Sequence, residues 1–128
     1  MAKVVARSHV ALVLALVLGG LSGLAGCGAT AHVGANRSLE IGLSEYRVTP
    51  QRVQARAGAL SLFVRNLGRV SHNLTLSADG QSLATTKPIR SGQSVWLFVD
   101  LAPGSYTMAS TMFSDQALGQ YGTLVVSR

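Results

Sequence analysis

From Ser38 onward the sequence predicts an all-β domain, an antiparallel β-sandwich. Apolar and polar residues alternate there with a period of two, which is the pattern of strands that bury one face. Turn signals such as Asp79-Gly80 and Pro103-Gly104 separate these runs at short, regular intervals. No run has the 3.6-residue period of an amphipathic helix, so we expect at most one short helical turn, at 115–118.

The individual strands follow from the alternating runs. We expect strands at 39–48, 53–57, 60–65, 72–76, 84–89, 95–101, 106–110 and 123–126. Pro50 ends the first ladder because it has no N–H to donate, and Pro88 makes the fifth run an edge strand. The run 95–101 is apolar on both faces, which predicts a central strand. Phe63, Trp96 and Phe98 are expected in the core or on a sheet face.

Composition agrees with one small folded domain. The chain has 128 residues, of which 48% are hydrophobic and 12% charged, so neither a disordered chain nor a coiled coil fits. It has 11 basic and 5 acidic residues, a formal net charge of +6. The arginines are dispersed, without a basic run or interleaved aromatic residues. We therefore expect a solvated surface, with some attraction to anionic lipid headgroups, and no nucleic-acid partner.

The first 26 residues have the organisation of a secretory signal peptide. Lys3 and Arg7 give a positive start, and the apolar run 10–18 is shorter than the roughly 20 residues of a membrane span. The segment 24–27, Leu-Ala-Gly-Cys, resembles the bacterial lipobox, in which the cysteine receives a diacylglycerol. We expect 1–26 to be a lipoprotein signal peptide and Cys27 to anchor the protein on the extracytoplasmic side of a bacterial membrane. The alternative is an ordinary signal peptide that leaves a free thiol.

Two further regions complete the predicted organisation. Residues 28–37 are small and polar and have no period, so 27–37 is expected to be the lipid anchor and a flexible tether. Residues 38–128 then form the folded domain.

Four segments of this domain, in this order, resemble the cupredoxin family. They are 46–50 (Tyr-Arg-Val-Thr-Pro), 62–74 with Asn66-Leu67-Gly68 and Ser71-His72, 101–107 (Leu-Ala-Pro-Gly-Ser-Tyr-Thr) and 119–126 (Gly-Gln-Tyr-Gly-Thr-Leu-Val-Val). Together they span nearly all of 38–127. The resemblance implies a Greek-key β-sandwich and, in the family, a blue-copper ion.

The resemblance also implies where the copper ligands would lie. His72 matches the first histidine, whereas Ser110 stands in the place of the cysteine and Asp115 in that of the second histidine. Gln120 occupies the axial methionine position. A blue-copper site needs a thiolate, and the only cysteine of the chain is Cys27. We therefore predict a degenerate site without a blue-copper centre.

Three interpretations of this cluster stay open at the level of sequence. In the first, His72, Ser110, Asp115 and Gln120 satisfy one another by hydrogen bonds, and the protein is a non-enzymatic binding or accessory module with an envelope protein as partner. In the second, His72 and a reduced N/O ligand set bind copper or zinc weakly.

His32 is a further ligand candidate in that second interpretation, and Met108 and Met112 would suit Cu(I). The third interpretation is a Ser/His/Asp hydrolase. It is the weakest, because the sequence has no G-x-S-x-G elbow.

Overall fold

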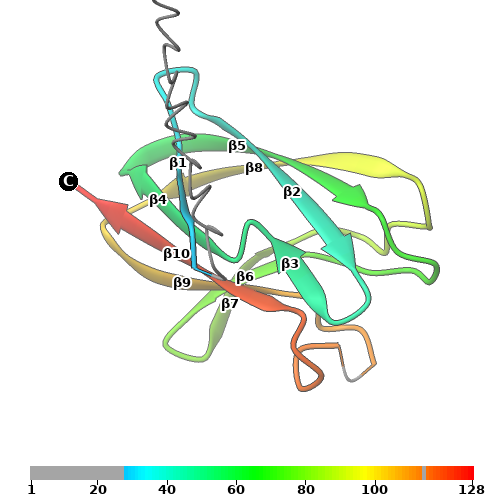
Figure 1. Ribbon diagram of the computed structural model, residues 1–128. Coiled ribbons are helices and arrows are strands. Elements are labelled where there is room, and N and C mark those ends of the chain that lie inside the picture. The colour runs from blue at the N-terminus through cyan, green and yellow to red at the C-terminus, as the bar shows by residue number, and fades with distance from the viewer. Residues whose placement is uncertain (1–27, 114) are drawn as a thin grey trace, which may run out of the picture.

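Two β-sheets packed face to face make up the computed structural model, which describes residues 28–113 and 115–128 (Figure 1). The predicted signal peptide and Cys27 lie outside these residues. The described part contains no α-helix, and therefore none with the length and apolar character needed to cross a membrane. The all-β sandwich predicted from the period-two pattern is confirmed.

Ten strands are present in the described residues. Their bounds are β1 Thr30–His32, β2 Ser38–Ser44, β3 Arg47–Thr49, β4 Arg52–Arg56, β5 Gly58–Asn66, β6 Thr75–Ala78, β7 Gln81–Thr85, β8 Ser94–Leu101, β9 Gly104–Ala109 and β10 Tyr121–Ser127.

Both sheets are mixed rather than purely antiparallel as predicted. The larger sheet has the order β1-β4-β10-β9-β6-β7, and the smaller one has the order β3-β2-β5-β8. The pairs β1–β4, β4–β10 and β2–β5 are parallel. The alternation of side chains is the same in parallel and antiparallel strands, so a period of two cannot tell them apart.

The core lies between the two sheets and is supplied by residues of the sandwich itself. On β5, Leu60, Leu62 and Val64 point inward and are almost fully buried, while their neighbours along the strand are partly exposed. Leu76, Met108 and other buried residues of the larger sheet belong to the same cluster. Residues 28–128 thus contain a complete hydrophobic core, the usual mark of an independently folding unit.

The ordered domain starts earlier than predicted, within the segment expected to be a flexible tether. Strand β1 pairs with β4, and Ala31 and Val33 pack against the core. Arg37 donates hydrogen bonds from Nε to the Ala59 carbonyl (3.0 Å) and from a terminal nitrogen to the Arg56 carbonyl (2.7 Å). A strand of three residues is too short to show a period of two, so the sequence pattern does not reveal it.

Strand β8 lies at an edge of its sheet, although its sequence predicts a central strand. It pairs with β5 on one side only. Trp96 and Phe98 project from the outer face and are 51% and 71% exposed. The run 84–89, which the sequence predicts to be an edge strand, overlaps β7 only at Ala84 and Thr85. Strand β7 does lie at an edge, at the end of the larger sheet.

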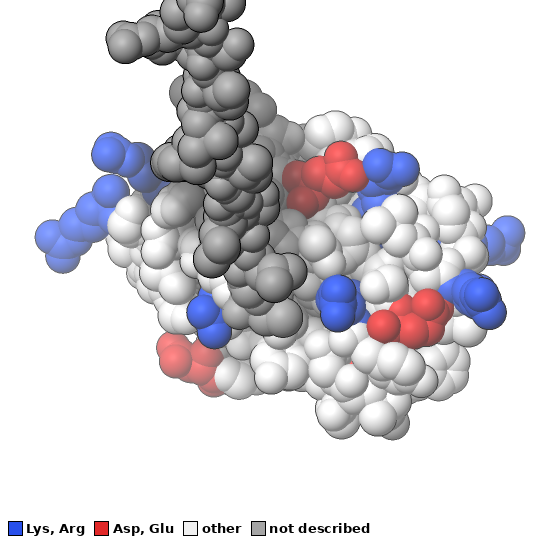
Figure 2. All heavy atoms as spheres, in the orientation of Figure 1, with Lys and Arg blue, Asp and Glu red and all other residues white. Residues whose placement is uncertain are grey.

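Basic side chains do not gather into one patch on the face shown in Figure 2. They occur there as separate spots, with acidic groups and uncharged surface between them. This distribution agrees with the dispersed arginines of the sequence and differs from the continuous basic surface that nucleic-acid binding uses.

Two leucines of similar chemistry and different burial test this view of the core. We expect Leu62→Ala to lower the free energy of unfolding by about 2–5 kcal/mol, because Leu62 is fully buried between the sheets. Leu83→Ala is the matched control: Leu83 is 54% exposed on β7, and its loss should change stability by less than about 0.5 kcal/mol. Urea denaturation of residues 28–128 measures both. Equal effects would contradict the assigned core.

Candidate functional site

Three of the four predicted site residues meet at one end of the sandwich. His72 lies between β5 and β6, whereas Ser110 and Asp115 belong to the connection between β9 and β10. The Nδ1 atom of His72 is 2.9 Å from Oδ2 of Asp115. Ser110 donates its hydroxyl proton to the same Oδ2 atom, at 2.6 Å. His72 and Ser110 are buried, and the Asp115 side chain is 12% exposed.

Backbone pairing fixes the position of His72. Its N–H donates to the Ile89 carbonyl and its carbonyl accepts from the Ile89 N–H, which forms an isolated β-bridge. The buried Asn66 amide supports this bridge by donating to the carbonyls of Val70 (2.7 Å) and Ile89 (2.8 Å). Its Oδ1 accepts from the Gly68 N–H. The Asn-x-Gly motif therefore holds the loop that delivers the histidine.

Asn73 connects the histidine loop to the β9–β10 connection, a role that sequence analysis missed. Its Oδ1 accepts from the Thr111 N–H at 2.8 Å, and its own N–H approaches Ser110 Oγ at 3.4 Å. The Ser110 hydroxyl has one proton, and the contact with Asp115 is shorter than the 3.1 Å contact with Asn73 Oδ1. Ser110 is thus held between the two loops as a donor to Asp115.

Gln120 is buried next to this cluster but its side chain is bonded elsewhere. Its Nε2 donates to the Ser44 carbonyl at 2.7 Å, and its Oε1 has no hydrogen-bond partner among the described residues. Its backbone is linked to the cluster by two hydrogen bonds: its N–H donates to the Asp115 carbonyl, and its carbonyl accepts from the Ser110 N–H. The predicted bonding therefore joins His72 Nδ1, Ser110 and Asp115, and it does not include the Gln120 side chain. His72 Nε2 also has no hydrogen-bond partner among the described residues.

Glu45 is a second residue that sequence analysis did not identify. Its Oε1 accepts hydrogen bonds from the N–H groups of Arg69 (2.5 Å) and Val70 (3.1 Å). The same oxygen lies 3.4 Å from Nε2 of His72, although the alignment is too poor for a hydrogen bond. Gly68 permits this approach, because a Cβ there would stand 2.5 Å from the Glu45 carboxylate. The sequence holds no local signal for this contact, because Glu45 and Gly68 lie far apart in the chain.

The hydrogen bonds from the loop lower the pKa of Glu45. The Arg69 N–H contributes most, followed by the N–H groups of Glu45 itself and of Val70, with a smaller contribution from His72. Together they lower the pKa from its ordinary value of 4.5 to about 2, because each donor stabilises the charged carboxylate.

The donor set does not fit a blue-copper ion. Nδ1 of His72 is 2.9 Å from Oδ2 of Asp115, and Nε2 is 3.4 Å from Oε1 of Glu45. A metal on Nδ1 would have to displace the contact with Asp115. The serine hydroxyl is neutral and already donates to Asp115, and the domain has no thiolate. Residues 28–113 and 115–128 hold no group of three or more His, Cys, Asp or Glu side chains placed to bind a metal. Among the described residues, two buried side-chain atoms have no hydrogen-bond partner, His72 Nε2 and Gln120 Oε1. One imidazole nitrogen and one amide oxygen are not the ligand set of a blue-copper ion, which needs a thiolate and two imidazoles.

The order of contacts also differs from a catalytic triad. In a triad the serine bonds to histidine, and the carboxylate orients the far side of the ring. Here the carboxylate of Asp115 stands in the middle, between Ser110 and His72. The imidazole does not contact the serine that it would have to activate.

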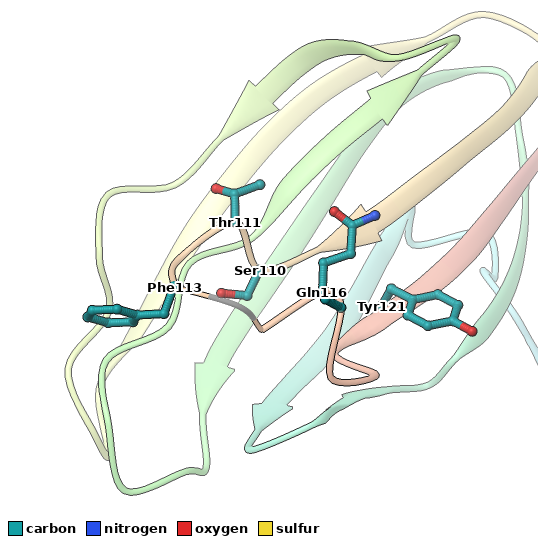
Figure 3. A pocket seen from close by; sticks show the side chains of 6 residues that line it. Ser110, Thr111, Phe113, Gln116 and Tyr121 are labelled. Carbon is teal, nitrogen blue, oxygen red and sulfur yellow. The ribbon is translucent and has the colours of Figure 1, made fainter.

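An open pocket of about 640 Å³ lies beside the cluster (Figure 3). Ser110 forms part of its wall, and the other lining residues are Thr111, Phe113, Gln116, Ala117 and Tyr121. Phe113 is 88% exposed and its ring extends away from Ser110 (Figure 3). The polar cluster therefore lies just below a surface with exposed aromatic groups.

Solved structures with the same architecture identify the fold. Reduced auracyanin from Roseiflexus castenholzii superposes with a TM-score of 0.67 at 18% identity, over 74% of this chain and all of that one. Rusticyanin from Thiobacillus ferrooxidans superposes with a TM-score of 0.64 at 11% identity, over 78% of this chain and 83% of that one. A purple cupredoxin from Nitrosopumilus maritimus superposes with a TM-score of 0.53 at 18% identity, over 69% of this chain and 98% of that one.

The domain has the cupredoxin fold. This confirms the resemblance drawn from the four sequence segments, as far as the fold is concerned. No family model and no curated protein matches the chain. At these identities the likeness establishes the cupredoxin fold and leaves the chemistry of the site to its own residues.

The lowered pKa of Glu45 predicts a pH-dependent effect of Glu45→Gln. Between pH 4.5 and about 2 the folded state binds fewer protons at Glu45 than the unfolded state does. The contribution of the carboxylate is therefore complete above pH 4.5 and disappears as the pH falls toward 2. We expect the variant to be less stable than the parent chain at neutral pH, with a difference that shrinks over this range.

Thermal unfolding from pH 7 to pH 2 measures that difference. Glu40→Gln is the control for charge, because Glu40 forms only an exposed ion pair with Arg65. A stability difference for Glu45→Gln that stays constant with pH would contradict the assigned hydrogen bonds.

Proposed function

We propose that this protein is a membrane-anchored extracytoplasmic lipoprotein whose cupredoxin-like domain serves as a non-enzymatic binding or accessory module. In this proposal the domain has no blue-copper centre. Its partners are the membrane, through a diacylglyceryl group on Cys27, and another protein of the cell envelope.

The observation that supports a copper-free module is the bonding of Asp115. Its Oδ2 atom accepts from both His72 and Ser110, so the residues at three family ligand positions are bonded to one another. Binding a metal there would break these buried hydrogen bonds, and each buried group left without a partner costs about 1–3 kcal/mol. Ser110 and Asp115 would also offer the metal no thiolate and no imidazole in return.

The alternative is a protein that binds or transfers copper or zinc through His72 and the remaining N/O ligands. The free Oε1 atom of Gln120 favours it, because a buried oxygen without a partner is available to an ion. The two functions differ in one measurable property, the stoichiometric uptake of metal.

Metal titration of purified residues 28–128 tests the proposed function. We expect no Cu(II), Cu(I) or Zn(II) to bind tightly at one equivalent by calorimetry, and no intense visible band with Cu(II). Tight one-to-one uptake that is lost in His72→Ala would establish the alternative instead.

A double variant provides the positive control. Ser110→Cys with Asp115→His restores a thiolate and a second imidazole at the positions that the family resemblance assigns to them. We expect this variant to bind Cu(II) and to gain an intense visible band. If the parent chain fails to bind and this variant succeeds, the loss of these two ligands explains the absence of copper.

The proposed anchor predicts a different result for Cys27→Ser. A diacylglyceryl group and its acyl chains hold a protein on the membrane by the burial of their methylene groups, about 0.8 kcal/mol each. We expect the parent chain to be in the membrane fraction of a bacterial host and to incorporate labelled fatty acid. Cys27→Ser should lose the label. Labelling that persists in this variant would contradict the lipid anchor.

A further inference from the structure

Strand β8 is exposed along nearly its whole length. From Ser94 to Asp100 every residue is exposed or half-buried, and only Leu101 is buried. The residues that point inward, Val95, Leu97 and Val99, are half-buried, whereas the inward residues of the neighbouring strand β5 are almost fully buried. An apolar strand of this kind is typical of the middle of a sheet, so a neighbouring strand on its free side would complete its burial.

The other three sheet edges are protected and β8 is not. Strands β1 and β3 have only three residues each. Strand β7 has five, and its pairing with β6 contains a register shift. Strand β8 has eight residues, none of them Lys or Pro, and its pairing with β5 is regular. Short edges, lysine, proline and irregular pairing are the devices that prevent strand-to-strand association.

The backbone groups on the free side of β8 are available for pairing. Its partner β5 occupies one side in a continuous antiparallel register from Gly58↔Leu101 to Arg65↔Ser94. No hydrogen bond from a described residue reaches the other side of 94–101. In Figure 1 the strand, drawn in yellow, follows the margin of the smaller sheet.

Aromatic rings form a row on the outer face at this edge. Phe63 on β5 lies across from Trp96, with ring centroids 4.7 Å apart. The ring centroids of Trp96 and Phe98 are 6.0 Å apart, and the two ring planes are nearly parallel. Tryptophan and phenylalanine exposed at the end of such a row are characteristic of interfaces, because they bury a large apolar area.

We propose that β8 pairs antiparallel with β8 of a second copy, so that the two smaller sheets join across a two-fold axis at Leu97. The sequence of the strand is self-complementary in this register. Trp96 faces Phe98 of the other copy, Val95 faces Val99, and Ser94 faces Asp100, so that no two like charges are opposed. The inference rests on the fold alone and does not depend on the lipid anchor or on the metal content.

Disulfide trapping tests the register. Because Ser94 lies opposite Asp100 of the other copy, mixing Ser94→Cys and Asp100→Cys variants of residues 28–128 should give several-fold more disulfide dimer than either variant alone. In either variant alone the two cysteines would be about 20 Å apart, six residues at about 3.4 Å each. Diamide serves as the oxidant. If either the Ser94→Cys or the Asp100→Cys variant does not fold, a mixture of Val95→Cys and Val99→Cys variants tests the same register.

Sedimentation over a concentration series tests the association without cross-links. We expect the parent domain to dimerise and Phe98→Lys to weaken the dimer by at least about tenfold, because a lysine would oppose Trp96 of the other copy. Val125→Lys is the control, since Val125 is an exposed strand residue of the larger sheet. Circular dichroism verifies that each variant is folded.

Two results would overturn the proposal. One is a parent domain that stays monomeric over the whole series. The other is a dimer that Phe98→Lys and Val125→Lys affect equally, or one that the mixed cysteine variants trap no better than the single ones.

Discussion

One carboxylate oxygen, Oδ2 of Asp115, accepts hydrogen bonds from two residues that lie far apart in the sequence. His72 approaches it from the loop after β5, and Ser110 from the end of β9. In a cupredoxin fold this is the corner at which the family resemblance places the metal ligands. Here the residues at those positions hold the two loops together directly. These hydrogen bonds therefore join the two loops at this corner of the domain.

The surroundings of His72 support the same view. Asn66 and the bridge to Ile89 hold its backbone, and Glu45 lies beside the ring nitrogen that Asp115 does not contact. The amide groups of the loop stabilise the Glu45 carboxylate, so that its charge persists to low pH. Because Nδ1 of His72 is 2.9 Å from the Asp115 carboxylate, a metal that bound to this nitrogen would have to displace that contact. The pocket above this cluster offers a surface with exposed aromatic groups.

Sequence periodicity predicted most strands, because burial of one face imposes a period of two on each of them. It could not predict which strands are neighbours. The apolar character of the run 95–101 predicts a central strand, whereas the structure has this run at an edge. Strand β1 was missed because three residues are too few to show a period. The family resemblance predicts His72, Ser110 and Asp115 as site residues. It does not predict the contact of Ser110 with Asn73 or that of His72 with Glu45, because these contacts have no local sequence signature.

Nitrogen NMR of His72 in isotopically labelled domain tests the central claim most directly. The account predicts that Nδ1 carries a proton that is donated to Asp115, and that its resonance does not change when one equivalent of Zn(II) or Cu(I) is added. An Nδ1 without a proton would contradict the hydrogen bond to Asp115. A resonance that shifts stoichiometrically to the position of a metal-bound imidazole would show that the corner is a working metal site. Either result would contradict the account.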